Sequence, residues 1–158
     1  MRIGVPKEIK PQENRIGLTP DSVKTLVSEG HEVLVEDNGG FEAGFDNDQY
    51  KNAGAKIIKK AADIFNDAEI IVKVKEPQKV EVEMIKENQI VYTYLHLAAA
   101  KELTEGLIKS KSINIAYETV TDDNGRLPLL APMSAVAGRM SVQAGAHCLE
   151  KNQKGRGV

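Results

Sequence analysis

The stretch of sequence that decides the fold reads Ile90-Val91-Tyr92-Thr93-Tyr94-Leu95-His96-Leu97. It is rich in aromatic and β-branched residues, and charged helical segments flank it on both sides, which is typical of a short buried strand. The strand is expected to end in His96, after which Ala98-Ala99-Ala100 allows a helix to begin. Ligands of α/β sheets bind at the carboxyl ends of the strands. His96 is therefore the first candidate functional residue.

Strand-like and helix-like segments alternate along most of the chain. Five further strands are predicted, at residues 2–5, 32–36, 55–58, 69–74 and 113–117. Residues 70–72 are continuously apolar, which favours a strand covered on both faces, as in parallel sheets. The alternation predicts an α/β fold, a doubly wound and mostly parallel sheet with helices on both faces, of the Rossmann-like or flavodoxin-like kind.

Helix boundaries follow from capping residues. Thr19-Pro20-Asp21 predicts a helix that begins at Pro20 and that Gly30 closes. Helical spacing of apolar residues predicts another helix over residues 80–87, and Asn124-Gly125 predicts a tight turn. A long helix rich in small residues is expected from residue 131 to about residue 151.

Composition narrows the class of protein. The 158 residues include 21 basic and 23 acidic side chains, for a net charge of −2, which argues against a nucleic-acid-binding protein. No apolar run approaches the length of a membrane span, and a signal-peptide core is not expected. The single cysteine, Cys148, suits a reducing cytoplasm. The three histidines are far apart in the sequence, so no metal site is predicted.

Two cations are predicted to follow strands in the way that His96 does. Lys75 follows the strand at 69–74, and a lysine there can polarise a carbonyl or hold a carboxylate. Arg15 lies in the loop after the first strand, and its forked guanidinium suits a carboxylate. Each residue also has an ordinary interpretation: Lys75 as a solvated loop charge, Arg15 as a surface residue, and His96 as a core histidine bonded to a carbonyl.

Met133 and Ser134 lie in the first turn of the long helix, where the helix dipole favours an anionic or phosphate-bearing ligand. Simple capping of the helix is an equal alternative. The glycine-rich segment at residues 38–44 lacks the G-x-G-x-x-G spacing of a dinucleotide fingerprint, so a turn is the better interpretation.

Several motifs together resemble those of one enzyme family. They are Met1-Arg2-Ile3-Gly4-Val5-Pro6-Lys7-Glu8, Glu13-Asn14-Arg15-Ile16-Gly17-Leu18-Thr19-Pro20, Val72-Lys73-Val74-Lys75-Glu76-Pro77, Tyr94-Leu95-His96-Leu97-Ala98 and Pro132-Met133-Ser134-Ala135-Val136-Ala137-Gly138-Arg139-Met140. The whole chain resembles the N-terminal part of alanine dehydrogenases. Transhydrogenases and saccharopine-type dehydrogenases are similar in fold, but the pairing of Lys75 with His96 favours alanine dehydrogenase.

The resemblance implies an NAD-dependent enzyme that converts L-alanine, NAD⁺ and water to pyruvate, ammonium and NADH. Arg15 and Lys75 would bind the substrate, His96 would be the catalytic acid/base, and Ser134 and Met133 would contact NAD. Two alternatives stay open: a module of a transhydrogenase-like or saccharopine-dehydrogenase-like enzyme, and a non-catalytic domain that binds keto acids or amino acids.

The resemblance also implies a domain organisation. Residues 1–130 would be the N-terminal portion of the substrate domain, residues 131–152 an interdomain helix, and residues 153–158 the start of a linker to an NAD-binding domain. We expect little dehydrogenase activity from the 158 residues alone, and an exposed apolar face that promotes association. Family members are cytoplasmic homo-oligomers, commonly hexamers, that use small-molecule substrates.

Overall fold

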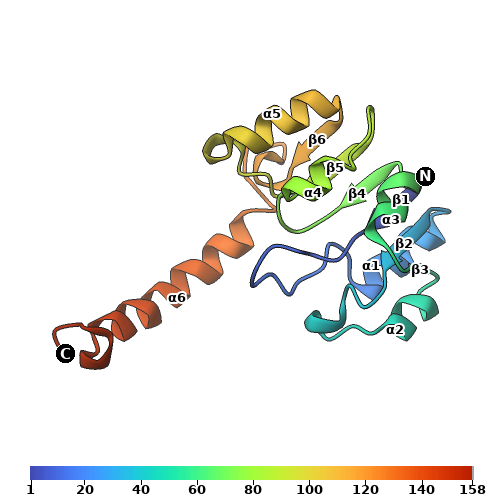
Figure 1. Cartoon of the computed structure of the whole chain (residues 1–158). Coiled ribbons are helices and arrows are strands. Elements are labelled where there is room, and N and C mark those ends of the chain that lie inside the picture. Colours follow the sequence, from blue (N-terminus) through green and yellow to red (C-terminus); the bar gives the residue numbers. More distant parts are fainter. Residues whose placement is uncertain (158) are drawn as a thin grey trace. The chain divides into compact units, whose positions relative to one another are not determined.

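Six strands form one parallel sheet in the order β3-β2-β1-β4-β5-β6 (Figure 1). The computed structural model describes residues 1–157, so Val158, the last residue of the predicted linker, lies outside them. The elements are β1 (Arg2–Val5), α1 (Pro20–Ser28), β2 (Glu32–Glu36), the 3₁₀ helix η1 (Phe41–Ala43), α2 (Asn47–Asn52), β3 (Lys56–Ile58), α3 (Ala61–Asp67), β4 (Ile70–Val72), α4 (Lys79–Val82), β5 (Ile90–Thr93), η2 (Leu97–Ala99), α5 (Lys101–Ser110), β6 (Ile113–Ala116), η3 (Tyr117–Thr119), α6 (Ala131–Leu149) and η4 (Lys151–Gln153).

The doubly wound sheet predicted from the alternation of segments is confirmed. Every pair of neighbouring strands runs parallel, with Ile3 opposite Val33 of β2 and opposite Ile70 of β4. The strand order reverses beside β1, because the chain adds β2 and β3 on one side and β4 to β6 on the other. Such a reversal opens a crevice at the carboxyl ends of the strands.

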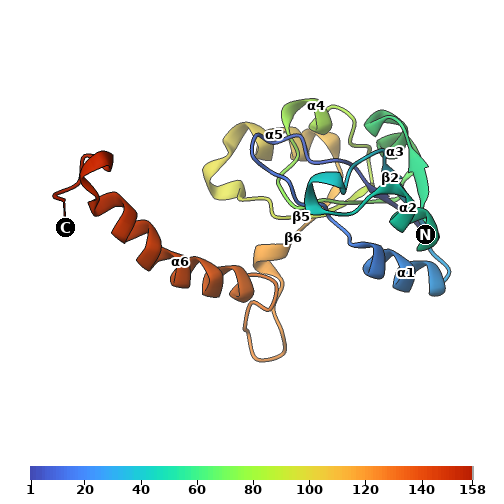
Figure 2. The ribbon, with the colours of Figure 1, turned by 90° about the horizontal axis from the view of Figure 1, so that it is seen from below.

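Different helices cover the two faces of the sheet. On one face, Val23 of α1 and Tyr50 of α2 pack against β1, β2 and Val72 of β4. On the other, Phe65 of α3 and Leu107 of α5 pack against a cluster that includes Val91 of β5. Figure 2 shows α1 on one side of the sheet and α4 and α5 on the opposite side. Burial of both faces explains the continuous apolar run in β4.

The α1 side of the sheet is open at β5 and β6. Ile90 of β5 lies opposite Ile113 of β6, and alternation puts Ile115 on the same face as Ile113. In the described chain Ile113 is 50% exposed and Ile115 is 41% exposed. Ala116 faces the other way and packs with the α5 cluster. An apolar strip is therefore left in contact with solvent.

Capping residues start and stop the helices as the sequence predicts. The Thr19 hydroxyl accepts a hydrogen bond from the Ser22 N–H over 3.3 Å, and Pro20 occupies the first turn of α1. Gly30 follows this helix with φ of +84°, a backbone conformation that costs glycine little. The tight turn at Asn124-Gly125 is also present, closed by a bond from the Gly125 N–H to the Asp122 carbonyl.

Several strands are shorter than predicted: β3 begins at Lys56 and not at residue 55, β4 covers Ile70–Val72 and not residues 69–74, and β6 ends at Ala116 and not at residue 117. Two further boundaries differ more. The helix expected over residues 80–87 stops at Val82, because Met84 and Ile85 donate to carbonyls three residues back and so tighten the last turn. The strand expected to continue to His96 ends at Thr93. His96 has φ of +50°, a left-handed conformation incompatible with a strand.

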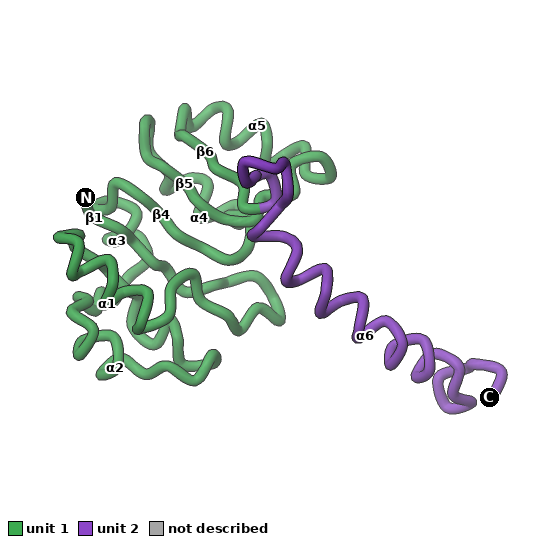
Figure 3. Tube along the Cα trace, turned by 180° about the vertical axis from the view of Figure 1, so that it is seen from behind, with its two compact units in different colours: residues 1–117 green, residues 118–158 purple. Residues whose placement is uncertain are grey.

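The chain divides into two compact units, residues 1–117 and residues 118 onward, which Figure 3 colours separately. The predicted substrate domain, with its boundary at residue 130, and the role of α6 as an interdomain helix stay predictions. The long helix itself is confirmed, since α6 spans Ala131–Leu149. Among residues 1–157, no helix is both long enough and apolar enough to cross a membrane.

Candidate functional site

The loop after β1 brings Arg15 to the carboxyl end of β4. Gly17, two residues further on, lies so close to β4 that a Cβ atom there would be 2.5 Å from the Val72 carbonyl oxygen. Ile16 between them is buried in the core on the α1 face. Glycine at residue 17 thus allows the loop to approach the backbone that leads to Lys75.

Glu13 holds the guanidinium of Arg15. Nε donates to Oε1 and Nη2 donates to Oε2, each over 2.7 Å, and the Arg15 N–H also donates to Oε1 over 3.0 Å. The hydrogen bonds from Arg15 lower the pKa of the Glu13 carboxyl to about 2 and raise that of the guanidinium. The pair is therefore fully ionised at neutral pH, and Glu13 takes two of the five N–H donors of the fork.

Lys75 is the second cation of the candidate site. After the hydrogen bonds from Arg15, the charge of Lys75 is among the influences that lower the pKa of Glu13. The backbone of Lys75 is fixed by two side chains, since its N–H donates to Oε1 of Glu8 over 3.3 Å and its carbonyl accepts from the Thr93 hydroxyl over 2.9 Å. The loop of Arg15 approaches Val72 and Lys73 at Gly17, so it lies close to the segment that carries Lys75.

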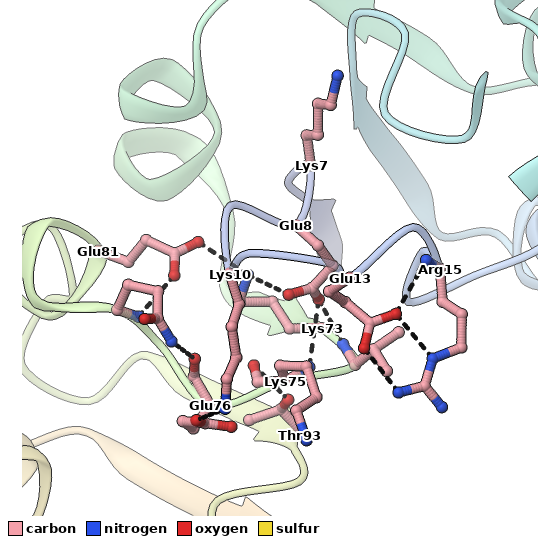
Figure 4. A network of polar contacts seen from close by, with 12 residues as sticks. Lys7, Glu8, Lys10, Glu13, Arg15, Lys73, Lys75, Glu76, Glu81 and Thr93 are labelled. Carbon is pink, nitrogen blue, oxygen red and sulfur yellow. Dashed lines mark hydrogen bonds and ion pairs between the residues drawn. The ribbon is translucent and has the colours of Figure 1, made fainter. Parts of the chain in front are cut away.

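A buried ion cluster of Lys73, Glu8 and Glu81 lies next to the backbone of Lys75. Lys73, which is 0% exposed, contacts Oε2 of Glu8 over 3.0 Å and Oε1 of Glu81 over 2.8 Å (Figure 4). Glu36 at the end of β2 also lies within the field of Lys73. Burial raises the pKa of the Glu81 carboxyl and of the Glu36 carboxyl, because each loses contact with water.

His96 lies on the segment that follows β5. The chain stays paired with β4 beyond the strand, since the Tyr94 N–H donates to the Val74 carbonyl over 3.2 Å. His96 comes two residues later and is exposed. Tyr94 is also close enough to Arg15 to influence its pKa. The segment that carries His96 therefore continues beside Val74 and Lys75 at the carboxyl end of the sheet.

An aromatic group borders this edge. The rings of Tyr92 and Tyr94 contact that of Tyr117 edge to face, with centroids 4.2 and 4.8 Å apart. Burial raises the pKa of the Tyr117 hydroxyl, so it remains a neutral group. These rings place apolar surface at the carboxyl ends of β5 and β6, where small-molecule sites combine apolar surface with a few polar groups.

Met133 and Ser134 belong to the second unit, in the first turn of α6. The N–H groups of Met133 and Ser134 both donate to the Leu130 carbonyl, and that of Ala131 donates to the Leu127 carbonyl. Pro132 has no N–H to donate. The first turn of α6 is therefore paired with the preceding turn, which weakens the argument for an anion site built from its N–H groups.

Sequence reasoning missed the acidic residues that organise the site, Glu8, Glu13 and Glu81. One signal was available: Lys73 interrupts an apolar stretch, and a lysine is almost never fully buried without a carboxylate partner. The sequence did not say which of its many acidic residues would supply that partner. Among residues 1–157, no group of three or more potential metal ligands comes together.

Relatives of known type match this chain along its whole length. An alanine dehydrogenase of Halomonas elongata is 53% identical over 158 residues, which are 100% of this chain and 43% of that protein. One from Methanococcus maripaludis is 51% identical, again over all of this chain and over 42% of the relative. The chain therefore spans less than half the length of these curated relatives.

Solved structures agree with the sequence matches. An L-alanine dehydrogenase superposes with a TM-score of 0.90 and 54% identity, covering 100% of this chain and 44% of that one. A transhydrogenase from Sinorhizobium meliloti gives 0.70 and 27%, covering 75% of this chain and 35% of that one. The family model described as "Alanine dehydrogenase/PNT, N-terminal domain" matches residues 4–137. This chain is therefore a member of the alanine dehydrogenase/PNT N-terminal domain family.

Proposed function

We propose that this chain is the N-terminal substrate domain of an NAD-dependent L-alanine dehydrogenase, which converts L-alanine, NAD⁺ and water to pyruvate, ammonium and NADH. The name of the relatives, alanine dehydrogenase, supports the reaction. One structural observation carries the proposal: the loop that holds Arg15 packs at Gly17 against the backbone of Val72 and Lys73, directly before Lys75. Two cations gathered at the carboxyl end of a parallel sheet suit a small carboxylic acid.

Arg15 and Lys75 bind the substrate in this proposal. The guanidinium, oriented by Glu13, pairs with the substrate carboxylate, and the ammonium of Lys75 contacts that carboxylate or the carbonyl oxygen of pyruvate. Arg15 has 54% of its side chain exposed, so an incoming anion can reach it. Both cations favour the developing negative charge on the oxygen of the reacting centre.

His96 is the proposed acid/base. NAD, when bound, accepts the hydride from the α-carbon of alanine. His96 then takes a proton from the water that attacks the resulting imine and stabilises the carbinolamine oxygen. Histidine suits this role because its side chain can gain and lose a proton near neutral pH. Its exposed position beyond β5 leaves room for substrate next to it.

Ser134 and Met133 are proposed contacts to NAD, in a limited sense. The paired N–H groups of the first turn of α6 do not form a cradle for a pyrophosphate. The Ser134 hydroxyl and the Met133 side chain can still contact an edge of the cofactor. We assign them no proton transfer.

The full-length enzyme tests the assignment. We expect L-alanine-dependent formation of NADH, and a loss of at least about 100-fold in kcat for His96→Ala, the usual size of an acid/base contribution. His31→Ala is the matched control, because His31 lies at the amino ends of the strands, directly before β2 and beside the N-terminal amine. Near-normal alanine oxidation by His96→Ala would remove the acid/base role.

A transhydrogenase-like module is the second candidate, favoured by the match to the transhydrogenase from Sinorhizobium meliloti. Hydride exchange between two nicotinamide cofactors, without any requirement for L-alanine or pyruvate, would support it. Assembly as a homo-oligomer such as a hexamer, and a cytoplasmic location, form part of our primary proposal. Size-exclusion chromatography and cell fractionation test them.

A further inference from the structure

The backbone of Lys75 is held on both sides by buried side chains. Glu8 accepts its N–H and Thr93 donates to its carbonyl. Glu8 is 6% exposed and Thr93 is 0% exposed, so water does not compete for these hydrogen bonds. The point from which the Lys75 side chain leaves the backbone is thereby fixed relative to β1 and β5.

Glu8 is in turn fixed by the ion cluster. Its Oε1 accepts the Val74 N–H over 2.6 Å, and its Oε2 contacts Nζ of Lys73 over 3.0 Å. Lys73 also reaches Oε1 of Glu81, whose Oε2 accepts the Gln78 N–H over 2.7 Å. The segment from Lys73 to Gln78 is tied by Glu8 at its start and by Glu81 at its end (Figure 4).

Such a cluster is a poor source of stability. Removing an ion pair from water costs about as much free energy as the pairing returns, and apolar replacements are often as stable. Here two carboxylates share one ammonium, and burial disfavours the charged form of Glu81. What the cluster supplies is a definite geometry, because directional bonds join Glu8 to the N–H groups of Val74 and Lys75 and to Nζ of Lys73.

We propose that Glu8, held by Lys73 and Glu81, is a positioning residue that aims Lys75 at the carboxylate of a small 2-oxo or amino acid. The inference rests on the proposed substrate-binding role of Lys75. Glu8 itself does not contact the substrate. Thr93 is a second positioning residue, because its hydroxyl donates to the Lys75 carbonyl.

Kinetics of the full-length enzyme test the proposal. We expect Glu8→Gln and Thr93→Val to raise the KM for pyruvate about tenfold, in the range of coupling between neighbouring groups. The effect on kcat should be smaller. Thr93→Ser keeps the hydroxyl and should restore the normal KM. The matched control is Glu32→Gln. It removes a carboxylate that pairs with Arg2 and Lys56 at the amino ends of the strands, away from the site.

A double-mutant cycle separates positioning from general damage. In a Lys75→Met background, Glu8→Gln should have no further effect on the KM for pyruvate, because the group it positions is gone. Its effect on thermal stability should persist in that background. An unchanged KM in Glu8→Gln, or equal effects in the two backgrounds, would overturn the proposal.

Hydrogen exchange gives a measurement that does not depend on activity. Glu8→Gln should speed exchange at the amides of Val74 and Lys75, and Glu32→Gln should not. If the unaltered enzyme neither oxidises L-alanine nor binds pyruvate, the proposed function fails. Faster exchange would then still show that Glu8 holds this segment, and unchanged exchange would refute the positioning role outright.

Discussion

The carboxylate of Glu13 accepts two hydrogen bonds of 2.7 Å from the guanidinium of Arg15, although the residues are only two apart in the sequence. The side chain of Glu13 is 10% exposed and that of Arg15 is 54% exposed. The carboxylate thus forms a fixed support, and the guanidinium extends from it towards solvent. A substrate carboxylate would meet a cation that is already oriented.

Replacing Glu13 by glutamine should lower stability at neutral pH by about 1 kcal/mol, a modest value because solvent screens the exposed Arg15. The folded pKa of about 2 lies below the ordinary 4.5. The stabilisation is therefore present above pH 4.5 and is lost as the pH falls towards 2. Urea unfolding of the two proteins should converge over this interval. A constant difference down to pH 2 would contradict it. Glu29→Gln, at an exposed residue after α1, is the control.

Gly17→Ala should disturb the site more than the substitution of one methyl group suggests. The added Cβ would lie 2.5 Å from the Val72 carbonyl oxygen, so the loop that carries Arg15 must move away from β4. We expect a drop in stability of about 1–3 kcal/mol, typical of overpacking, together with weaker substrate binding. Thermal unfolding and the KM for L-alanine measure the two effects.

Gly138→Ala is the matched control for that substitution. Gly138 lies inside α6, and nothing is within 4 Å of an added Cβ. Alanine is the better helix former by about 1 kcal/mol, so this variant should be as stable as the original or slightly more so. Equal destabilisation by both substitutions would remove the steric explanation.

Tyr50→Phe should have opposite consequences at neutral and at alkaline pH. The Tyr50 hydroxyl donates to the Leu18 carbonyl over 2.9 Å, and its loss should cost about 1 kcal/mol at pH 7. Burial raises the pKa of this hydroxyl from 10 to about 12. The unfolded chain ionises first, so the original protein loses stability between pH 10 and 12.

The phenylalanine variant lacks that alkaline loss. The difference in denaturation midpoint between the two proteins should shrink, and then reverse, as the pH rises above 10. A difference independent of pH would mean that the hydroxyl titrates alike in the folded and unfolded chains.

Ile113→Thr combined with Ile115→Thr should reduce self-association of the 158-residue chain. These side chains leave an apolar strip on β6, and exposed apolar surface promotes association. Threonine retains a high preference for strands, so β6 should persist. Ile108→Thr, on α5 and 72% exposed, is the control for a lone apolar residue. Sedimentation should show association falling in the double variant alone.

The sequence was sufficient for the layers of the fold. Apolar runs such as residues 70–72 and caps such as Thr19 act over a few residues, so local patterns identified the strands, the first helix and the doubly wound sheet. Local patterns were less exact at element ends, since β4 stops at Val72 and not at residue 74. Two ends differ most. His96 adopts a left-handed backbone after Thr93, and α4 stops at Val82. At α4 the chain changes to hydrogen bonds three residues back, and at His96 the backbone turns out of the strand, and neither change has a signal in the apolar pattern.

For the candidate site, the sequence by itself determined the family and which cations to examine, because Arg15, Lys75 and His96 each lie in a distinctive motif. Only the tertiary structure decided which carboxylates accompany them. Glu8 and Lys73 are 65 residues apart, and their pairing depends on β1 lying directly beside β4. Strand order is determined by packing over the whole sheet, so it cannot be predicted from a local stretch of sequence.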